Sequence, residues 1–124
     1  LYPLIAPLIG ALGAFIAGSN TVSNMMLGQF QYEVAGVLSV SSALIVAQQA
    51  IGAAAGNMIA IHNVVAASAT VGLLGQEGQT IRKTLLPTLY YILATGLLGM
   101  AAIHLFRVTD YKIASHNTRR EEEK

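Results

Sequence analysis

Cysteine and tryptophan are absent from the 124 residues, and only 10% of the residues are charged. Without cysteine there is no disulfide framework, no thiolate metal site and no thiol nucleophile. From Leu1 to Ile81 the ionisable acids and bases are Glu33, His62 and Glu77. A soluble domain normally carries about a quarter charged residues, spread along its helices. The composition therefore excludes an ordinary soluble domain.

The charges that are present offer no surface for nucleic acid. They gather at Arg82 and Lys83 and again from Arg107 to Lys124, and the net charge is only +1. A nucleic-acid-binding domain would need a basic face, and the apolar body has none. We expect no nucleic-acid partner.

Catalysis is not predicted either. Asp110 lies beyond the last apolar run, so no Ser/His/Asp set or carboxylate pair can form among the apolar segments. His62, His104 and His116 are far apart in the sequence and have no acidic neighbours at metal-ligand spacing. We expect a protein that is not an enzyme and that holds no metal and no cofactor.

The clearest element is the apolar run 84–106, which is bracketed by Lys83 and Arg107. As a helix it would reach about 34 Å, enough to cross a hydrocarbon core of about 30 Å. It predicts a transmembrane helix, preceded by a polar loop at 76–83 and followed by a polar C-terminal tail at 107–124. The absence of an initiator methionine suggests that the chain is the C-terminal part of a longer protein.

Residues 37–75 form a second apolar stretch, which is too long for one straight crossing because 39–74 alone would reach about 54 Å. Gly52, Gly56 and Asn57, followed by His62 and Asn63, predict a break at membrane depth. The freed backbone groups must then face protein or a water-filled cavity. Alternatively, Gly52 and Gly56 form a close-packing face for another helix. Both interpretations can hold together.

Residues 1–36 contain an apolar segment, a polar cluster at 18–24, and apolar residues again from Met25. Two arms of ten residues would each reach about 15 Å, half a bilayer. This pattern predicts a re-entrant helical hairpin with its polar tip near the midplane. The alternative is one continuous crossing from about Leu8 to Phe30. In either case the fold is an all-α polytopic membrane protein.

The two polar clusters, 19–24 and 57–63, carry the functional hypothesis. Helix breaks at the bilayer centre expose helix N-termini, whose free N–H groups attract an anion. Neutral amides and hydroxyls add donors without burying a charge, which suits a carboxylate that must bind and leave. The predicted substrate-binding residues are Ser19, Asn20, Thr21, Ser23, Asn24, Gly56, Asn57 and Asn63. His62 is a candidate for proton coupling or, alternatively, a helix-packing residue.

Three segments also resemble a known family: Pro7 to Asn24 (PLIGALGAFIAGSNTVSN), Gly56 to Ile59 (GNMI) and Asn63 to Gly75 (NVVAASATVGLLG). They are similar to the C-terminal portion of the L-lactate permease family. This resemblance implies a multi-pass carrier of the plasma (inner) membrane that takes up L-lactate, and often glycolate, together with a proton. Its partners would be the lipid bilayer, a small carboxylate substrate and the missing N-terminal part of the same transporter.

The Gly18–Thr21 segment is also similar to the hairpin tips of sodium-coupled divalent-anion symporters, whose C-terminal half runs hairpin, broken helix, last helix. Two alternatives to proton-coupled lactate uptake stay open. One is a sodium-coupled carrier of another organic acid, and the other is a non-transporting membrane subunit in which polar residues only join helices.

The resemblance has one departure, because some members of the family have Asp at the position of Asn20, Lys at that of Asn57 and Gln near His62. The loss of both charges together would keep the site neutral if Asn20 and Asn57 face each other.

Segment order also predicts which ends lie on the same side of the membrane. Glu33 and the tail should share one side, with 76–83 opposite. The five Lys and Arg of the tail, against two in the loop, favour a cytoplasmic tail. The divalent-anion relatives would place it outside, so the side stays open.

Overall fold

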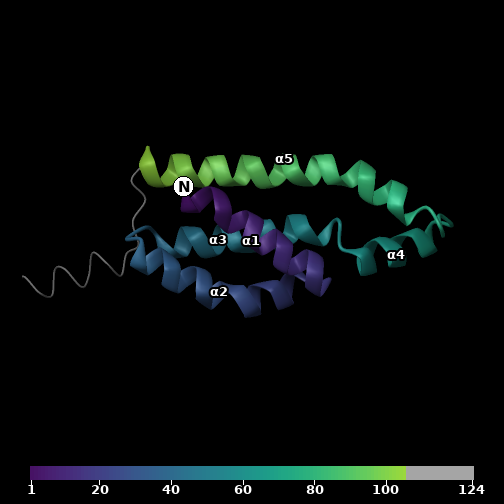
Figure 1. The fold of residues 1–124 in the computed structure, drawn as a ribbon, viewed down its shortest axis with the longest axis horizontal. Coiled ribbons are helices and arrows are strands. Elements are labelled where there is room, and N and C mark those ends of the chain that lie inside the picture. The colour runs from purple at the N-terminus through teal and green to yellow at the C-terminus, as the bar shows by residue number, and fades with distance from the viewer. Residues whose placement is uncertain (106–124) are drawn as a thin grey trace, which may run out of the picture.

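The computed structural model describes residues 1–105, and within them every regular element is a helix. The helices are α1 (Tyr2–Ala17), α2 (Asn20–Val37), α3 (Ser42–Asn57), α4 (Ile61–Thr70) and α5 (Glu77–His104), as Figure 1 shows. The all-α prediction is confirmed for this part of the chain. The predicted tail at 107–124 lies outside the described residues.

A two-residue turn separates α1 from α2. Gly18 ends α1 in the left-handed conformation, with φ 67°, and its N–H donates to Ala14 O at 2.8 Å. Ser19 is extended, and its Oγ accepts from the N–H of Val22 at 3.3 Å, which caps α2. Because this cap starts a new helix at once, the non-helical tip is shorter than the predicted cluster 18–24. Residues 20–24 belong to the first turns of α2.

The two helices are antiparallel and form a hairpin. Tyr2 Oη, at the start of α1, donates to Gln31 Oε1 near the end of α2 at 2.6 Å. Ser23 Oγ donates to Gly10 O at 2.9 Å. These contacts exclude the continuous crossing from Leu8 to Phe30. The arms have 16 and 18 residues, longer than the predicted ten, since Pro3 is tolerated in the first turn of a helix and does not delay its start.

The predicted break lies between α3 and α4, which are bent by 47° relative to each other. It falls at residues 58–60, after Gly52 and Gly56, which are both inside α3. A Cβ at Gly52 would collide with Pro7 O, and one at Gly56 with Ala11 O. These glycines therefore let the backbones of α1 and α3 touch, as the close-packing interpretation predicts. The helix break lies a few residues later in the chain, at 58–60.

Helix α5 is the one described helix that is long and apolar enough to cross a membrane by itself, and the bent pair α3 and α4 would make a second span. It begins at Glu77, so most of the predicted loop 76–83 is helical. Gln76 O accepts from the N–H groups of Gln79 and Thr80 at 3.0 and 3.1 Å, and the carboxylate of Glu77 suits a helix N-terminus. The connection between α4 and α5 is correspondingly short.

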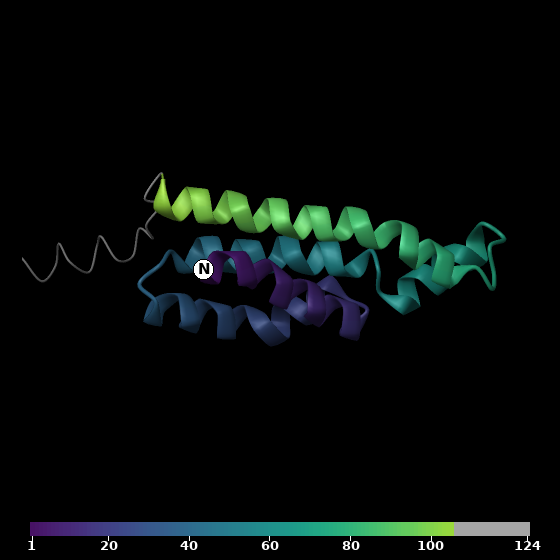
Figure 2. The ribbon, with the colours of Figure 1, turned by 45° about the horizontal axis from the view of Figure 1, so that its top comes forward.

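The two views agree on the arrangement (Figures 1 and 2): α1 and α3 lie centrally, with α2 on one side and α5 on the other. The α2–α3 connection and the C-terminal end of α5 share one end of the bundle, and the α4–α5 connection lies at the opposite end. Tyr2, Val40 and Ile103 accordingly pack against one buried cluster. The hairpin turn lies beside the break between α3 and α4.

Candidate functional site

The hairpin turn and the helix break are joined by one side chain. Asn63 Nδ2, in the first turn of α4, lies 3.2 Å from Gly18 O in the hairpin turn. The same nitrogen lies 2.8 Å from Asn57 Oδ1 and 3.2 Å from Asn57 O at the end of α3. The two polar clusters, far apart in the sequence, thus meet at a junction formed by Gly18, Asn57, His62 and Asn63.

His62 occupies the side of the junction next to the hairpin turn. A Cβ at Gly18 would lie 2.5 Å from His62 Nδ1, so only glycine leaves room for the ring. The positive φ of Gly18 demands glycine as well. The His62 side chain is otherwise exposed, and its imidazole can meet a small molecule at the junction.

Two helices begin at the junction, α2 at Asn20 and α4 at Ile61. The first N–H groups of a helix have no acceptor within it, and together with the helix dipole they form a partial positive charge. Ser19 caps only one N–H of α2, and no side chain caps α4. Both helix starts can therefore donate hydrogen bonds to an anion without any charged side chain.

Asn20 and Asn24 lie one turn apart at the start of α2. Asn24 Nδ2 donates to Asn20 Oδ1 at 3.0 Å. Asn24 Oδ1 is buried and has no hydrogen-bond partner within residues 1–105. An unpaired buried acceptor is costly, so it marks a place where a donor from a ligand would be stabilising.

The remaining predicted site residues fall into two groups, those exposed near the junction and those buried between helices. Thr21 is exposed, and Ser19 and Asn57 are partly exposed near the junction. Ser23 is buried and bonded to Gly10 O, and Gly56 packs on the backbone of α1. The structure thus places Ser23 and Gly56 in helix packing.

Sequence reasoning missed a buried pair of amides, Gln31 on α2 and Gln49 on α3, both 0% exposed. Gln31 Nε2 donates to Ala6 O at 3.2 Å and to Gln49 Oε1 at 3.0 Å. Gln49 Nε2 in turn donates to Ser23 Oγ at 3.1 Å. With Tyr2 bonded to Gln31, this network joins α1, α2 and α3. Gln49 stands in an otherwise apolar run with Gln48, which was the available signal, whereas Gln31 lies between Gln29 and Glu33 and gave none.

Replacing Gln49 by leucine should destabilise the protein by about 1–3 kcal/mol, because Gln31 and Ser23 lose a buried partner. Gln29→Leu is the matched control, since Gln29 is exposed and bonds only Glu33, and it should change stability by less than about 0.5 kcal/mol. Thermal unfolding of the purified full-length protein in detergent measures both. Equal unfolding temperatures for the two variants would contradict the assigned role of the network.

Comparison with known proteins identifies the family of the chain. The family model described as L-lactate permease matches residues 1–106. A putative L-lactate permease of Haemophilus influenzae is 38% identical over 105 residues, which are 85% of this chain and 20% of that protein. No solved structure matches the chain, and the similarity to divalent-anion symporters stays a prediction.

Two further relatives are named for different substrates, glycolate and L-lactate. The glycolate permease GlcA of Escherichia coli is 31% identical over 106 residues, 86% of this chain and 19% of that protein. The L-lactate permease of Bacillus subtilis is also 31% identical, with the same coverage. The chain spans about a fifth of the length of these relatives, which are named as transport proteins and not enzymes. With its apolar span and its match over all the described residues, the chain belongs to the L-lactate permease family, whose members are integral membrane proteins.

Proposed function

We propose that this chain is part of a transporter that takes up L-lactate and related 2-hydroxy monocarboxylates such as glycolate, with the substrate bound at the junction. The observation that carries the proposal is the start of two helices, α2 and α4, at the junction. A monocarboxylate carries one negative charge, which the remaining free N–H groups of the two helix N-termini balance without a fixed cation. The relatives named for lactate and glycolate support this substrate class.

Each polar group then has a role. The N–H groups of Asn20 and Thr21, the hydroxyls of Ser19 and Thr21, and the Asn57 amide donate to the carboxylate. Asn63 holds the hairpin turn against the break, because its Nδ2 already faces three oxygen atoms. Asn24 Oδ1 accepts the hydrogen of the 2-hydroxyl group. Because Oδ1 is covered in this structure, the Asn24 side chain turns when substrate enters.

Uptake is coupled to a proton, and His62 carries it. An imidazole ring can bind and release a proton at a ring nitrogen, which suits a proton carrier. Its ring lies against the hairpin turn, so protonation would add a positive charge beside the bound anion. The hairpin is re-entrant in this proposal, which the position of its turn beside the helix break supports.

One feature favours a second candidate, sodium coupling. Gly18 O, Asn57 O and Asn57 Oδ1 converge on Asn63 Nδ2 within 2.8–3.2 Å. If the Asn63 side chain turned away, the three oxygen atoms could face a small cation, since hard cations prefer oxygen ligands. The proposed experiment separates the two ions.

The test is uptake of labelled L-lactate into proteoliposomes containing the full-length permease. An imposed inward proton gradient should drive uptake, whereas an inward sodium gradient at equal pH should not. Sodium-driven uptake would replace the proton by sodium, and uptake under neither gradient would favour a structural subunit. Propionate, which lacks the 2-hydroxyl group, should be a poor substrate.

The Asn24 side chain allows a sharper test of the site. Asn24→Leu removes the acceptor and should lower the preference for lactate over propionate by at least about tenfold, because a site built for a hydroxyl discriminates strongly against its absence. Asn24→Asp keeps an acceptor and should keep the preference. An unchanged ratio in Asn24→Leu, at any absolute rate, would remove Asn24 from the substrate site.

A further inference from the structure

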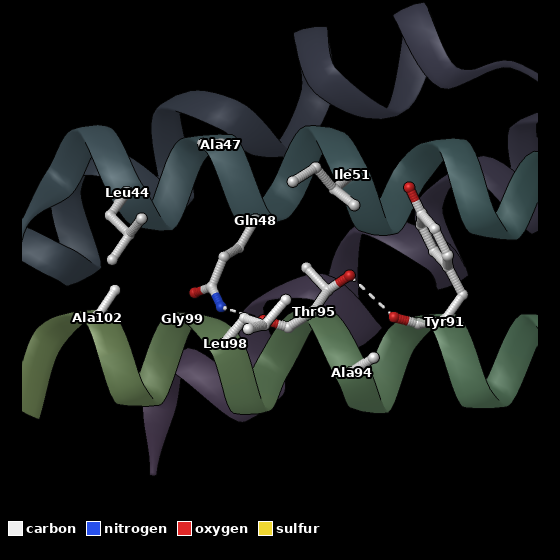
Figure 3. Close-up of a pocket in the computed structure, with 10 residues that line it drawn as sticks. All are labelled: Leu44, Ala47, Gln48, Ile51, Tyr91, Ala94, Thr95, Leu98, Gly99 and Ala102. Carbon is white, nitrogen blue, oxygen red and sulfur yellow. Dashed lines mark hydrogen bonds between the residues drawn. The ribbon is translucent and has the colours of Figure 1, made fainter. Parts of the chain in front are cut away.

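A groove of about 430 Å³ runs between α3 and α5, away from the junction. Figure 3 shows its lining residues on the two facing helices. They are Leu44, Ala47, Gln48, Ile51, Tyr91, Ala94, Thr95, Leu98, Gly99 and Ala102. Apart from one amide, a hydroxyl and a phenol, its walls are hydrocarbon.

The amide belongs to Gln48, which points from α3 toward α5 (Figure 3) and is 2% exposed. Its Nε2 donates to Thr95 O at 3.1 Å. Gly99 lies directly opposite, and a Cβ there would collide with the amide. Gln48 Oε1, by contrast, is buried without a hydrogen-bond partner among residues 1–105.

None of the described residues that line the groove donates a hydrogen bond to Gln48 Oε1. The Thr95 hydroxyl, which also lines the groove, already donates to Tyr91 O within its own helix at 2.8 Å, as Figure 3 shows. Lipid chains carry no donor, so an acyl chain in the groove would leave Oε1 unpaired in hydrocarbon, which is costly. A molecule that fills the groove and carries an O–H or N–H group would therefore stabilise Gln48 Oε1 by donating a hydrogen bond.

We propose that a membrane-spanning helix from the part of the permease outside these 124 residues packs in this groove and donates a side-chain hydrogen bond to Gln48 Oε1. The relatives are more than four times as long as the chain, since 85% of it matches 20% of one relative and 86% of it matches 19% of the other. The small side chains of Ala47, Ala94 and Ala102 let a helix backbone approach closely. The Gln48 amide is held only through Nε2, so it can turn Oε1 toward the incoming donor.

The first test is photo-crosslinking in the full-length permease in membranes. A benzophenone amino acid at Ala47, on the groove, should form an intramolecular product with a peptide that precedes residue 1. The same probe at Leu97, exposed on α5 and not a groove residue, should give mainly lipid adducts. Lipid adducts alone at Ala47, or a product between two copies, would overturn the proposal.

The second test needs no bulky probe. It asks whether Gln48→Leu lowers or raises the Tm of the full-length protein. With a partner donor in place, Gln48→Leu breaks a buried hydrogen bond and should lower the Tm of the full-length protein by about 2–4 °C. With the groove filled by lipid, the same change removes an unpaired acceptor and should leave the Tm unchanged or raise it. The loss of the Nε2 bond weighs little, because Thr95 O lies inside α5, where it has its own helical partner. An unchanged or higher Tm would therefore overturn the proposal.

Discussion

Gly52→Ala should disrupt the contact between α1 and α3 and destabilise the protein by about 3 kcal/mol, the upper part of the range for overpacking. The added methyl group would meet Pro7 O, a backbone atom that cannot turn away as a flexible side chain could. Gly56→Ala would meet Ala11 O in the same way, one turn further along. The double variant should fail to assemble.

Gly28→Ala is the matched control, because nothing lies within 4 Å of a Cβ at that position in α2. Alanine is the better helix former by up to about 1 kcal/mol, so this variant should be as stable as the parent or more stable. Thermal unfolding and monodispersity of the full-length protein in detergent measure both variants. If Gly52→Ala unfolds at the parent's temperature, the close backbone contact of α1 and α3 is not required for stability.

A single charged substitution at Asn20 or Asn57 should nearly abolish uptake. Opposite charges at both positions should restore part of it. Asn20→Asp or Asn57→Lys alone places an unbalanced charge at membrane depth, which costs about 3 kcal/mol and corresponds to a loss of roughly 100-fold. Asn57 reaches Gly18 through Asn63, and Asn20 follows Gly18 by two residues. Opposite charges at 20 and 57 would therefore lie near enough to compensate each other.

Initial uptake rates of labelled L-lactate in proteoliposomes test this compensation, with equal amounts of folded protein. The neutral variants Asn20→Leu and Asn57→Leu serve as controls for the loss of the amides themselves. Equal damage in the double variant and in the single variants would contradict a shared site for Asn20 and Asn57.

The sequence predicted the hairpin, the broken helix and the last helix, because each rests on an apolar length or a clear change in polarity. It did not predict where each helix starts. Serine followed by polar residues can be a loop or a capped first turn, and Ser19 caps α2, so residues 20–24 are helical. Glycine raises the same ambiguity, since Gly52 and Gly56 could break a helix or let two helices touch.

The candidate site was only partly predictable for a related reason. Polar residues at membrane depth face either a ligand or another helix, and the spacing does not separate these roles. His62 and Asn63 do meet the hairpin turn, and Asn57 reaches it through Asn63. Ser23, by contrast, bonds α1 and α3. The role of Gln49 depends on its partner Gln31, 18 residues away, and no local pattern reveals such a pair.

The attachment of the hairpin turn to α4 through Asn63 has a consequence for the rate of transport. Glycine contacts and the buried glutamines hold α1, α2 and α3 together as one block, whereas α4 packs mainly against α5. Opening the junction then requires rotation at residues 58–60 and the loss of the Asn63 hydrogen bonds, at a cost of about 2 kcal/mol. We expect an open form populated at a few per cent and exchanging within microseconds to milliseconds. In the function proposed above, opening of the junction would therefore not be the slow step of uptake.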